Sequence, residues 1–227
     1  MSEMEQQTEF WESPDVVQRF AERDPDHRLS ALADTLDPET GRVLDIGCAG
    51  GRNAVFLAQR GVQVDALDAS AGMVEETRRR LTPILGEEEA RRRVRQGPMD
   101  DLSAYPSDAF DFVVALGIHQ NAGSMAEWDR SIAEAARVLR SGGRLLVAHF
   151  TPELDLTGDG VHPVPGEPHV FTGLRPGVRA VLLDADELDE AMARHGFRPL
   201  VPSETVVVEL EKGRRVTVNA LYERVED

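Results

Sequence analysis

The chain has 227 residues, of which 41 are Asp or Glu and 25 are Lys or Arg, so its formal net charge at pH 7 is −16. A chain of this length buries enough apolar surface for a sizeable core, and we expect a single domain over residues 1–227. The negative charge disfavours polyanionic partners, so we expect neither nucleic acid nor an anionic membrane surface to be bound.

The cysteine content and the first residues indicate the compartment. Cys48 is the only cysteine, so no disulfide forms within the chain and a reducing environment is expected. The N-terminal residues are acidic and polar, unlike a secretion signal, and no apolar run is long enough to cross a bilayer. We therefore expect a soluble cytoplasmic protein, whose oligomeric state the sequence does not indicate.

The first predicted element is a helical lead-in over residues 1–40. Its aromatic residues Phe10, Trp11 and Phe20 have spacings compatible with one apolar helix face. Two interpretations remain open for this segment: it covers a ligand pocket, or it covers an edge of the core.

The next stretch has the order strand, tight turn, helix. Val43–Ile46 is apolar apart from Asp45, a glycine-rich turn spans Gly47–Gly51, and a helix-like apolar spacing follows. This order is typical of the first unit of a doubly wound sheet, where ligands bind beyond the carboxyl ends of the strands. Glycines in such a turn let the backbone come close to a small cofactor.

Two common cofactor motifs do not match this turn. The dinucleotide pattern G-x-G-x-x-G requires glycines where Ala49 and Arg52 stand, and the phosphate-binding loop requires Lys followed by Ser or Thr where Arg52 and Asn53 stand. A nicotinamide-dependent oxidoreductase is therefore disfavoured.

A second strand, Val62–Asp68, ends in a carboxylate about 20 residues beyond the turn, the separation at which an acid accepts hydrogen bonds from ribose hydroxyls. The alternative is that Asp68, like Ser70, serves as the N-cap of a helix that begins near Ala71. Both interpretations remain open from the residues alone.

Three further strands complete a parallel core. Residues 93–102 predict a third strand and the loop after it, Phe110–Gly117 predicts a central buried strand, and residues 137–148 predict a helix end, a glycine turn and a fifth strand.

The remainder departs from this alternation. Residues 151–182 contain five prolines and five glycines and are predicted to be an irregular excursion, which we expect to hang over the active face like a lid. A helix with a capping box at Asp184 and Glu187 ends near Gly196, and residues 205–210 and 215–224 predict an antiparallel hairpin.

The acid and glycines Asp45, Gly47 and Gly51, together with Asp68, resemble the motifs of the class I (Rossmann-like) S-adenosylmethionine-dependent methyltransferases, in their small-molecule branch. The resemblance covers residues 40–150 well, with Ala49 in place of the middle glycine. It implies an α/β fold with a doubly wound, seven-stranded, mostly parallel sheet and a C-terminal hairpin. The expected regions are a cap (1–40), a cofactor-binding core (41–150), a lid-like insertion (151–182), and a C-terminal helix and hairpin (183–227).

The resemblance also implies a site for S-adenosyl-L-methionine. Asp68 would hold the ribose, and Asp100 or a backbone carbonyl would meet the adenine amine. Met99 would pack on the adenine face, although an ordinary core position is an equal alternative. The expected cofactor-binding residues are Asp45, Gly47, Cys48, Ala49, Gly51, Asn53, Asp68, Ala69, Met73, Met99, Asp100, Leu116 and Gly117.

Catalysis requires few dedicated residues, because the cofactor carries the activated carbon for an in-line displacement. If the acceptor must lose a proton, His119 after the fourth strand is the first candidate base and His149 at the end of the fifth strand is the second. No metal is expected, since His162, Glu167 and His169 match no established zinc spacing.

The expected acceptor is a small molecule. The segment after the fourth strand lacks the Asn/Asp-Pro-Pro-aromatic motif of base-amine methylation, and Cys48 lies in the wrong place for cytosine C5 methylation. Two alternatives remain: a non-catalytic module that binds S-adenosylmethionine or S-adenosylhomocysteine, and a protein methyltransferase.

Overall fold

The structure, a computed structural model, describes residues 10–37, 41–175 and 177–225. A large mixed sheet runs through its centre in the order β10-β11-β5-β4-β1-β2-β3, with β9 pairing β11. The parallel part comprises β1 (Arg42–Ile46), β2 (Gln63–Asp68), β3 (Val94–Gln96), β4 (Phe110–Leu116) and β5 (Leu139–Phe150). The antiparallel part comprises β9 (Phe197–Pro199), β10 (Glu204–Leu210) and β11 (Gly213–Arg224). The predicted fold class and C-terminal hairpin are confirmed.

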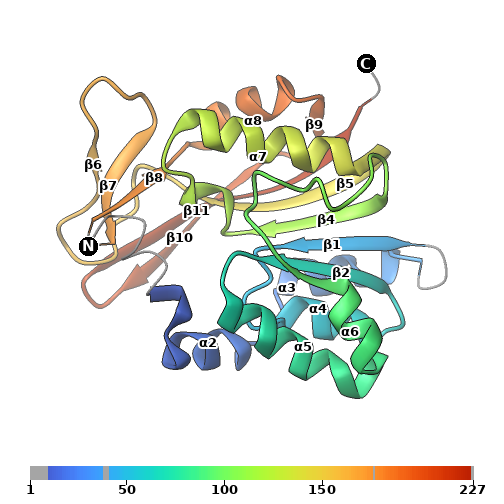
Figure 1. Cartoon of the computed structure of the whole chain (residues 1–227). Coiled ribbons are helices and arrows are strands. Elements are labelled where there is room, and N and C mark those ends of the chain that lie inside the picture. The colour runs from blue at the N-terminus through green and yellow to red at the C-terminus, as the bar shows by residue number, and fades with distance from the viewer. Residues whose placement is uncertain (1–9, 38–40, 176, 226–227) are drawn as a thin grey trace.

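Helices cover both faces of the sheet (Figure 1). One face carries α3 (His27–Leu32), α4 (Arg52–Ala58), α5 (Ala71–Leu85) and α6 (Glu87–Arg93), and the other carries α7 (Met125–Val138) and α8 (Ala185–Ala193). The central strands are apolar on both sides because both sides are packed: Val113 and Val114 of β4 are fully buried in two different core clusters.

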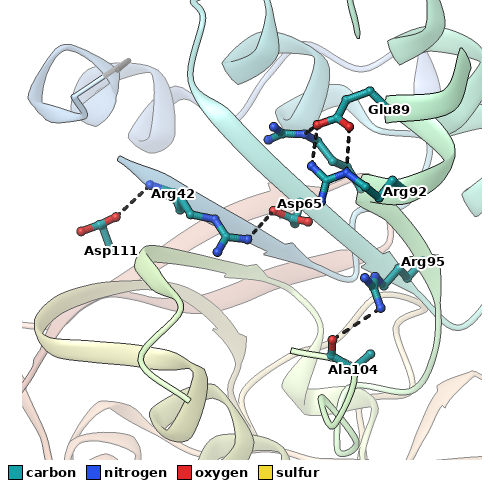
Figure 2. Close-up of polar contacts among 8 residues, drawn as sticks. Arg42, Asp65, Glu89, Arg92, Arg95, Ala104 and Asp111 are labelled. Carbon is teal, nitrogen blue, oxygen red and sulfur yellow. Dashed lines mark hydrogen bonds and ion pairs between the residues drawn. The ribbon is translucent and has the colours of Figure 1, made fainter. Parts of the chain in front are cut away.

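An ion-pair network fixes β1 at the end away from the glycine turn (Figure 2). The backbone N–H of Arg42 donates to Asp111 at 2.8 Å, and its guanidinium pairs with Asp65 of β2 at 3.3 Å. Nearby, Arg92 pairs with Glu89 on α6. Asp65 pairs with Arg42 within the sheet, whereas Asp68 is the last residue of β2 and lies at the carboxyl end of the strand.

The predicted irregular stretch 151–182 is wrong in part, because it contains a three-stranded antiparallel sheet. Its strands are β6 (His162–Pro163), β7 (Val170–Arg175) and β8 (Val178–Val181). The strands are short and the register shifts between Phe171 and Arg175, so no sustained alternation of apolar residues exists for a sequence pattern to reveal.

The fifth strand is also longer than predicted. The predicted helix end is confirmed, since α7 ends at Val138. The strand begins directly afterwards at Leu139 and passes through Gly142 and Gly143, where a turn was expected. Gly142 has a φ of +70°, and the pairing with β4 is irregular between Phe110 and Phe112. The glycines therefore mark a bulge within the strand instead of a separate turn.

Two segments lie at the side toward which β1 and β4 point (Figure 1). They are the small β6–β7–β8 sheet and the lead-in helix α2 (Pro14–Ala21), and the 3₁₀ turn η2 (His119–Asn121) follows β4 at the same side. The 3₁₀ turn η1 (Ala33–Thr35) lies at the other end of the sheet, where the Thr35 carbonyl accepts from Arg144 near the start of the β4–β5 pairing. Of the predicted lead-in, residues 1–9 and 38–40 lie outside the described residues. No helix among the described residues is long and apolar enough to span a bilayer.

Candidate active site

A cavity of about 310 Å³ opens at the carboxyl ends of β1, β2 and β4. Of the predicted cofactor-binding residues, ten line it: Asp45, Gly47, Cys48, Ala49, Asn53, Asp68, Ala69, Met99, Leu116 and Gly117. Trp11 and Phe20 of the predicted lead-in also line it, which agrees with the interpretation that this segment covers a ligand pocket. The sequence analysis did not assign the other lining residues to the site: Glu12, Ile46, Arg52, Leu67, Ser70, Gly97, Pro98, Ile118, Asn121 and Glu127.

The turn after β1 depends on glycine at two positions for different reasons. Gly47 has a φ of +69°, and a Cβ there would meet the side chain of Ile118 within 2.9 Å. Gly51 has a φ of +79°, and its Cβ would meet Thr77 of α5 at 2.8 Å. Gly51 does not line the cavity, so the structure gives it a packing role between the turn and α5.

Asp68 joins the end of β2 to that turn. One carboxylate oxygen accepts the backbone N–H of Ala49 at 2.8 Å and the other accepts the N–H of Ser70 at 3.0 Å. The N-cap of α5 is Ser70, whose hydroxyl accepts the N–H of Met73 at 3.1 Å. Burial raises the pKa of Asp68. A carboxylate has further lone pairs, so two accepted N–H groups leave capacity for ligand hydroxyls.

Asp45 lines the cavity and has a carboxylate oxygen that accepts no hydrogen bond from the described residues. Its side chain is buried, and Oδ2 has no hydrogen-bond partner among the described residues. Burial raises the pKa of Asp45 to about 7, with Arg52 opposing the rise and Asp68 adding to it. A buried carboxylate oxygen without a partner is costly, and it matches a ligand group that is cationic or carries N–H donors.

The lead-in is fastened to the start of α5 by a residue that no sequence signal identified. The carboxylate of Glu12 accepts the N–H groups of Ala71 at 2.8 Å and Gly72 at 2.9 Å, and the Trp11 carbonyl accepts the Ser70 hydroxyl at 3.2 Å. A carboxylate on a helix N-terminus is favourable in both charge and hydrogen bonding. This attachment holds Trp11 in the cavity wall.

The two candidate histidines lie outside the lining. The hydroxyl of Ser131 donates to the Trp128 carbonyl at 2.7 Å and so accepts from Nδ1 of His119 at 2.9 Å. Nε2 of His119 is then an unprotonated, buried acceptor with no partner among the described residues. His149 accepts the Trp128 indole N–H at 3.1 Å and donates from Nδ1 to the Phe150 carbonyl at 2.8 Å.

Burial sets the charge of both rings. It lowers the pKa of His119 to about 3, with His149 adding to the effect, and it lowers the pKa of His149 to about 4. Both imidazoles are therefore neutral near pH 7.

Two other predicted residues also lie away from the cavity lining. Met73 is buried within α5 at 1% exposure, and Asp100 pairs with Arg130 at 3.0 Å. Met73 faces the core because of its position in the first turn of α5, and Asp100 lies in a turn whose sequence has no periodic pattern.

The comparisons with known proteins agree with this geometry. Residues 43–143 match the model of a methyltransferase domain. The chain is 33% identical over 144 residues to Methyltransferase GfsG of Streptomyces halstedii, covering 61% of this chain and 48% of that protein. It is also 33% identical over 121 residues to a demethylmenaquinone methyltransferase of Clavibacter sepedonicus, covering 52% of this chain and 45% of that protein. The chain thus spans about half the length of the curated relatives it matches.

Solved structures share the fold at low sequence identity. A methyltransferase described as SAM-dependent from Methanosarcina mazei superposes with a TM-score of 0.65 at 20% identity, covering 87% of this chain and 98% of that one. The SAM-bound amino pentose methyltransferase CalS10 of Micromonospora echinaspora gives a TM-score of 0.61 at 21% identity, covering 93% and 96%.

Proposed function

We propose that this chain, whose residues 43–143 belong to the methyltransferase domain family and whose sheet has the class I fold, transfers a methyl group from S-adenosylmethionine to a small-molecule acceptor. The observation that carries the proposal is the cavity at the carboxyl ends of β1 and β2. Asp45 and Asp68 both line it, and Asp45 has an unpartnered oxygen.

The residues present fit the cofactor of this family, S-adenosylmethionine. Asp68 would accept the ribose hydroxyls with the lone pairs that Ala49 and Ser70 leave free, and the open oxygen of Asp45 would face the amino-acid part. The backbone between Gly47 and Ala49, which has little side-chain bulk, would lie along the ligand. Met99 and Leu116 supply apolar wall.

The chemistry divides between cofactor and chain. Bound S-adenosylmethionine supplies a methyl carbon activated by its sulfonium, open to in-line displacement by an acceptor atom. The chain orients the acceptor and excludes water, with Trp11, Phe20 and Ile118 as apolar lining. Holding two reactants in attack geometry is worth up to about 7–11 kcal/mol.

Where the acceptor must lose a proton, His119 is the proposed base. His149 is the second candidate and the weaker one, because the Trp128 indole N–H already occupies its acceptor nitrogen. The fixed tautomer of His119 supports this role, since it leaves Nε2 as a free acceptor. The lowered pKa makes it a weak base. The proposal therefore favours acceptors that are already ionised or acidic.

Two findings support a small acceptor. The cavity is bounded by the lead-in and has a volume suited to small ligands, about 310 Å³. The names of several relatives refer to quinones, as in the ubiquinone biosynthesis O-methyltransferase of Xanthomonas oryzae pv. oryzae, which is 30% identical over 121 residues.

Two measurements test the proposal. Calorimetric titration with S-adenosylhomocysteine should give saturable binding, and incubation with methyl-labelled S-adenosylmethionine and a panel of phenolic, amine and carboxylate acceptors should label a small product. Binding without any labelled product would favour a non-catalytic binding module. Label on protein alone would favour a protein methyltransferase. Absence of saturable S-adenosylhomocysteine binding would overturn the proposed function and both of these alternatives.

A further inference from the structure

Arg175 contacts both η2 and the lead-in, two segments that contribute residues to the cavity lining. Nη2 of Arg175, at the end of β7, donates to Oδ1 of Asn121 at 2.5 Å. Its guanidinium carbon lies 4.8 Å from the centroid of the Trp11 ring and 5.2 Å from that of Phe10. Arg175 is not itself among the lining residues, but Asn121 and Trp11 both are. Arg175 therefore lies directly behind two lining residues that come from distant parts of the chain.

The charge of Arg175 is not balanced by any described carboxylate. Three half-buried arginines have acidic partners: Arg93 pairs with Glu89, Arg137 with Glu134, and Arg179 of the same small sheet with Glu167. Others of this class donate to backbone carbonyls, as Arg80 does to Gly50. For Arg175 the described residues supply one amide oxygen and two aromatic rings, and its buried Nε has no partner among them. Burial lowers the pKa of Arg175 to about 10, and no charged neighbour opposes that shift.

An unpaired, desolvated guanidinium is expensive unless an anion completes it. Its planar set of donors suits an oxyanion such as a carboxylate or a phenolate. The rings beside it add a second constraint. Trp11 packs edge-on against Phe10 at 4.9 Å and against Phe20 at 5.4 Å, and Trp11 and Phe20 both line the cavity. Such a surface favours a flat ring.

We propose that Arg175 is a specificity-determining residue that selects acceptors carrying an ionised oxygen, a carboxylate or a phenolate, on an aromatic ring that packs against Trp11. This inference rests on the proposed function, because it assigns the acceptor side of the same cavity. An already ionised acceptor also agrees with the weak basicity of His119, since such an acceptor needs no proton removed.

The test compares matched probes on protein saturated with S-adenosylhomocysteine. The probes are 4-hydroxybenzoate and its neutral analogue 4-hydroxybenzamide, and their binding is measured by the quenching of Trp11 fluorescence. The second tryptophan, Trp128, is fully buried, and its fluorescence is measured separately in a Trp11→Phe variant. The wild-type protein should bind the carboxylate about tenfold or more tightly than the amide. Arg175→Gln should abolish that preference, and Arg175→Lys should keep part of it.

A third probe separates the two kinds of oxyanion. Phenol and phenolate forms of 4-nitrophenol absorb at different wavelengths, so the pH at which the bound molecule ionises is directly readable. If Arg175 binds a phenolate, bound 4-nitrophenol ionises at a lower pH than the free compound, and Arg175→Gln removes this shift. If Arg175 binds only a carboxylate, the preference for 4-hydroxybenzoate is seen without a shift in the ionisation of 4-nitrophenol.

The control variant is Arg179→Gln, an arginine of the same small sheet that pairs with Glu167, which is not a lining residue, whereas Arg175 contacts the lining residues Asn121 and Trp11. It should retain the preference shown by the wild-type protein. The inference is overturned if the wild-type protein shows neither the benzoate preference nor the nitrophenol shift, if Arg175→Gln retains them, or if no probe binds saturably. Binding of S-adenosylhomocysteine is measured by calorimetry on the same proteins. If that binding is intact while the role of Arg175 is overturned, the proposed function is unaffected.

Discussion

The carboxylate of Asp68 accepts the backbone N–H of Ala49 at 2.8 Å, so the acid at the end of β2 holds the turn that follows β1. The second oxygen of Asp68 accepts the N–H of Ser70 at the start of α5. One side chain thus connects three elements around the cavity and also lines it. Changes at this residue are expected to affect both the shape of the turn and the binding of the ligand.

Asp68→Ala should weaken S-adenosylhomocysteine binding by about tenfold to a hundredfold, because hydrogen bonds to a charged acceptor are lost. Calorimetric titration measures this. Asp65→Asn is the matched control in the same strand, since Asp65 pairs with Arg42 (Figure 2) and neither residue lines the cavity. It should lower stability and leave affinity unchanged. Equal affinity in Asp68→Ala and wild type would contradict the assignment.

Asp45→Asn should stabilise the ligand-free protein at alkaline pH. The pKa of Asp45 is raised to about 7 on folding, so its contribution to stability is fully present below the unfolded value and is lost as pH rises through 7. Replacing it should add up to about 4 kcal/mol at pH 8 and little at pH 4. Urea unfolding at the two pH values checks this, and equal gains at both would refute it. The same variant should bind S-adenosylhomocysteine more weakly.

Ala49→Gly should raise the free energy of unfolding by about 1 kcal/mol. Ala49 has a φ of +49°, a left-handed conformation that costs a residue with a Cβ about 1–2 kcal/mol. Glycine removes that strain but carries more conformational entropy in the unfolded chain. Ala133→Gly, at an exposed position inside α7, is the control and should lose about 1 kcal/mol. A loss at both positions would contradict the strain at Ala49.

The buried pair His119 and His149 should make stability fall in acid. Their pKa values are lowered on folding to about 3 and about 4. The unfolded chain therefore binds more protons below pH 6.5, and stability present above that pH is lost as pH falls toward 3. Each histidine contributes a slope of about 1.4 kcal/mol per pH unit.

The variant His119→Asn isolates one half of this effect, because its amide retains a donor for Ser131 but does not titrate in this range. Urea unfolding between pH 6 and pH 4.5 measures how steeply the free energy of unfolding falls with pH. In His119→Asn, the part of this slope that comes from the two histidines should be about half of its wild-type value. An unchanged slope would mean that the protein does not hold His119 neutral.

Glu12→Gln should loosen the lead-in. The two hydrogen bonds to Ala71 and Gly72 place a negative charge at the start of α5, and losing that charge should cost about 1 kcal/mol. Acrylamide should then quench Trp11 fluorescence more strongly. Glu22→Gln is the control, since Glu22 is exposed and bonds only Gln18 among the described residues. Equal quenching in both variants would show that Glu12 does not fasten the lead-in.

Local patterns were sufficient to predict the parallel core. The apolar runs at Val43–Ile46 and Phe110–Leu116, the turn at Gly47–Gly51 and the carboxylate of Asp68 follow from short-range constraints on strands, tight turns and strand ends. Each of these features is defined by residues that are only a few positions apart in the sequence. The order of strands and helices was accessible for that reason, whereas ten of the cavity-lining positions came from the family resemblance that these motifs carry.

The parts that only the tertiary structure decided depend on contacts between distant segments. The small β6–β7–β8 sheet, the attachment of Glu12 to α5 and the placement of Arg175 against Trp11 and Asn121 leave no periodic trace in the sequence. The same holds for His119, whose position after β4 was evident but whose burial behind Ser131 was not. The sequence determined where the turn after β1 forms because that turn is local. The tertiary structure decided what surrounds the cavity, because the residues around it come from positions more than fifty apart in the chain.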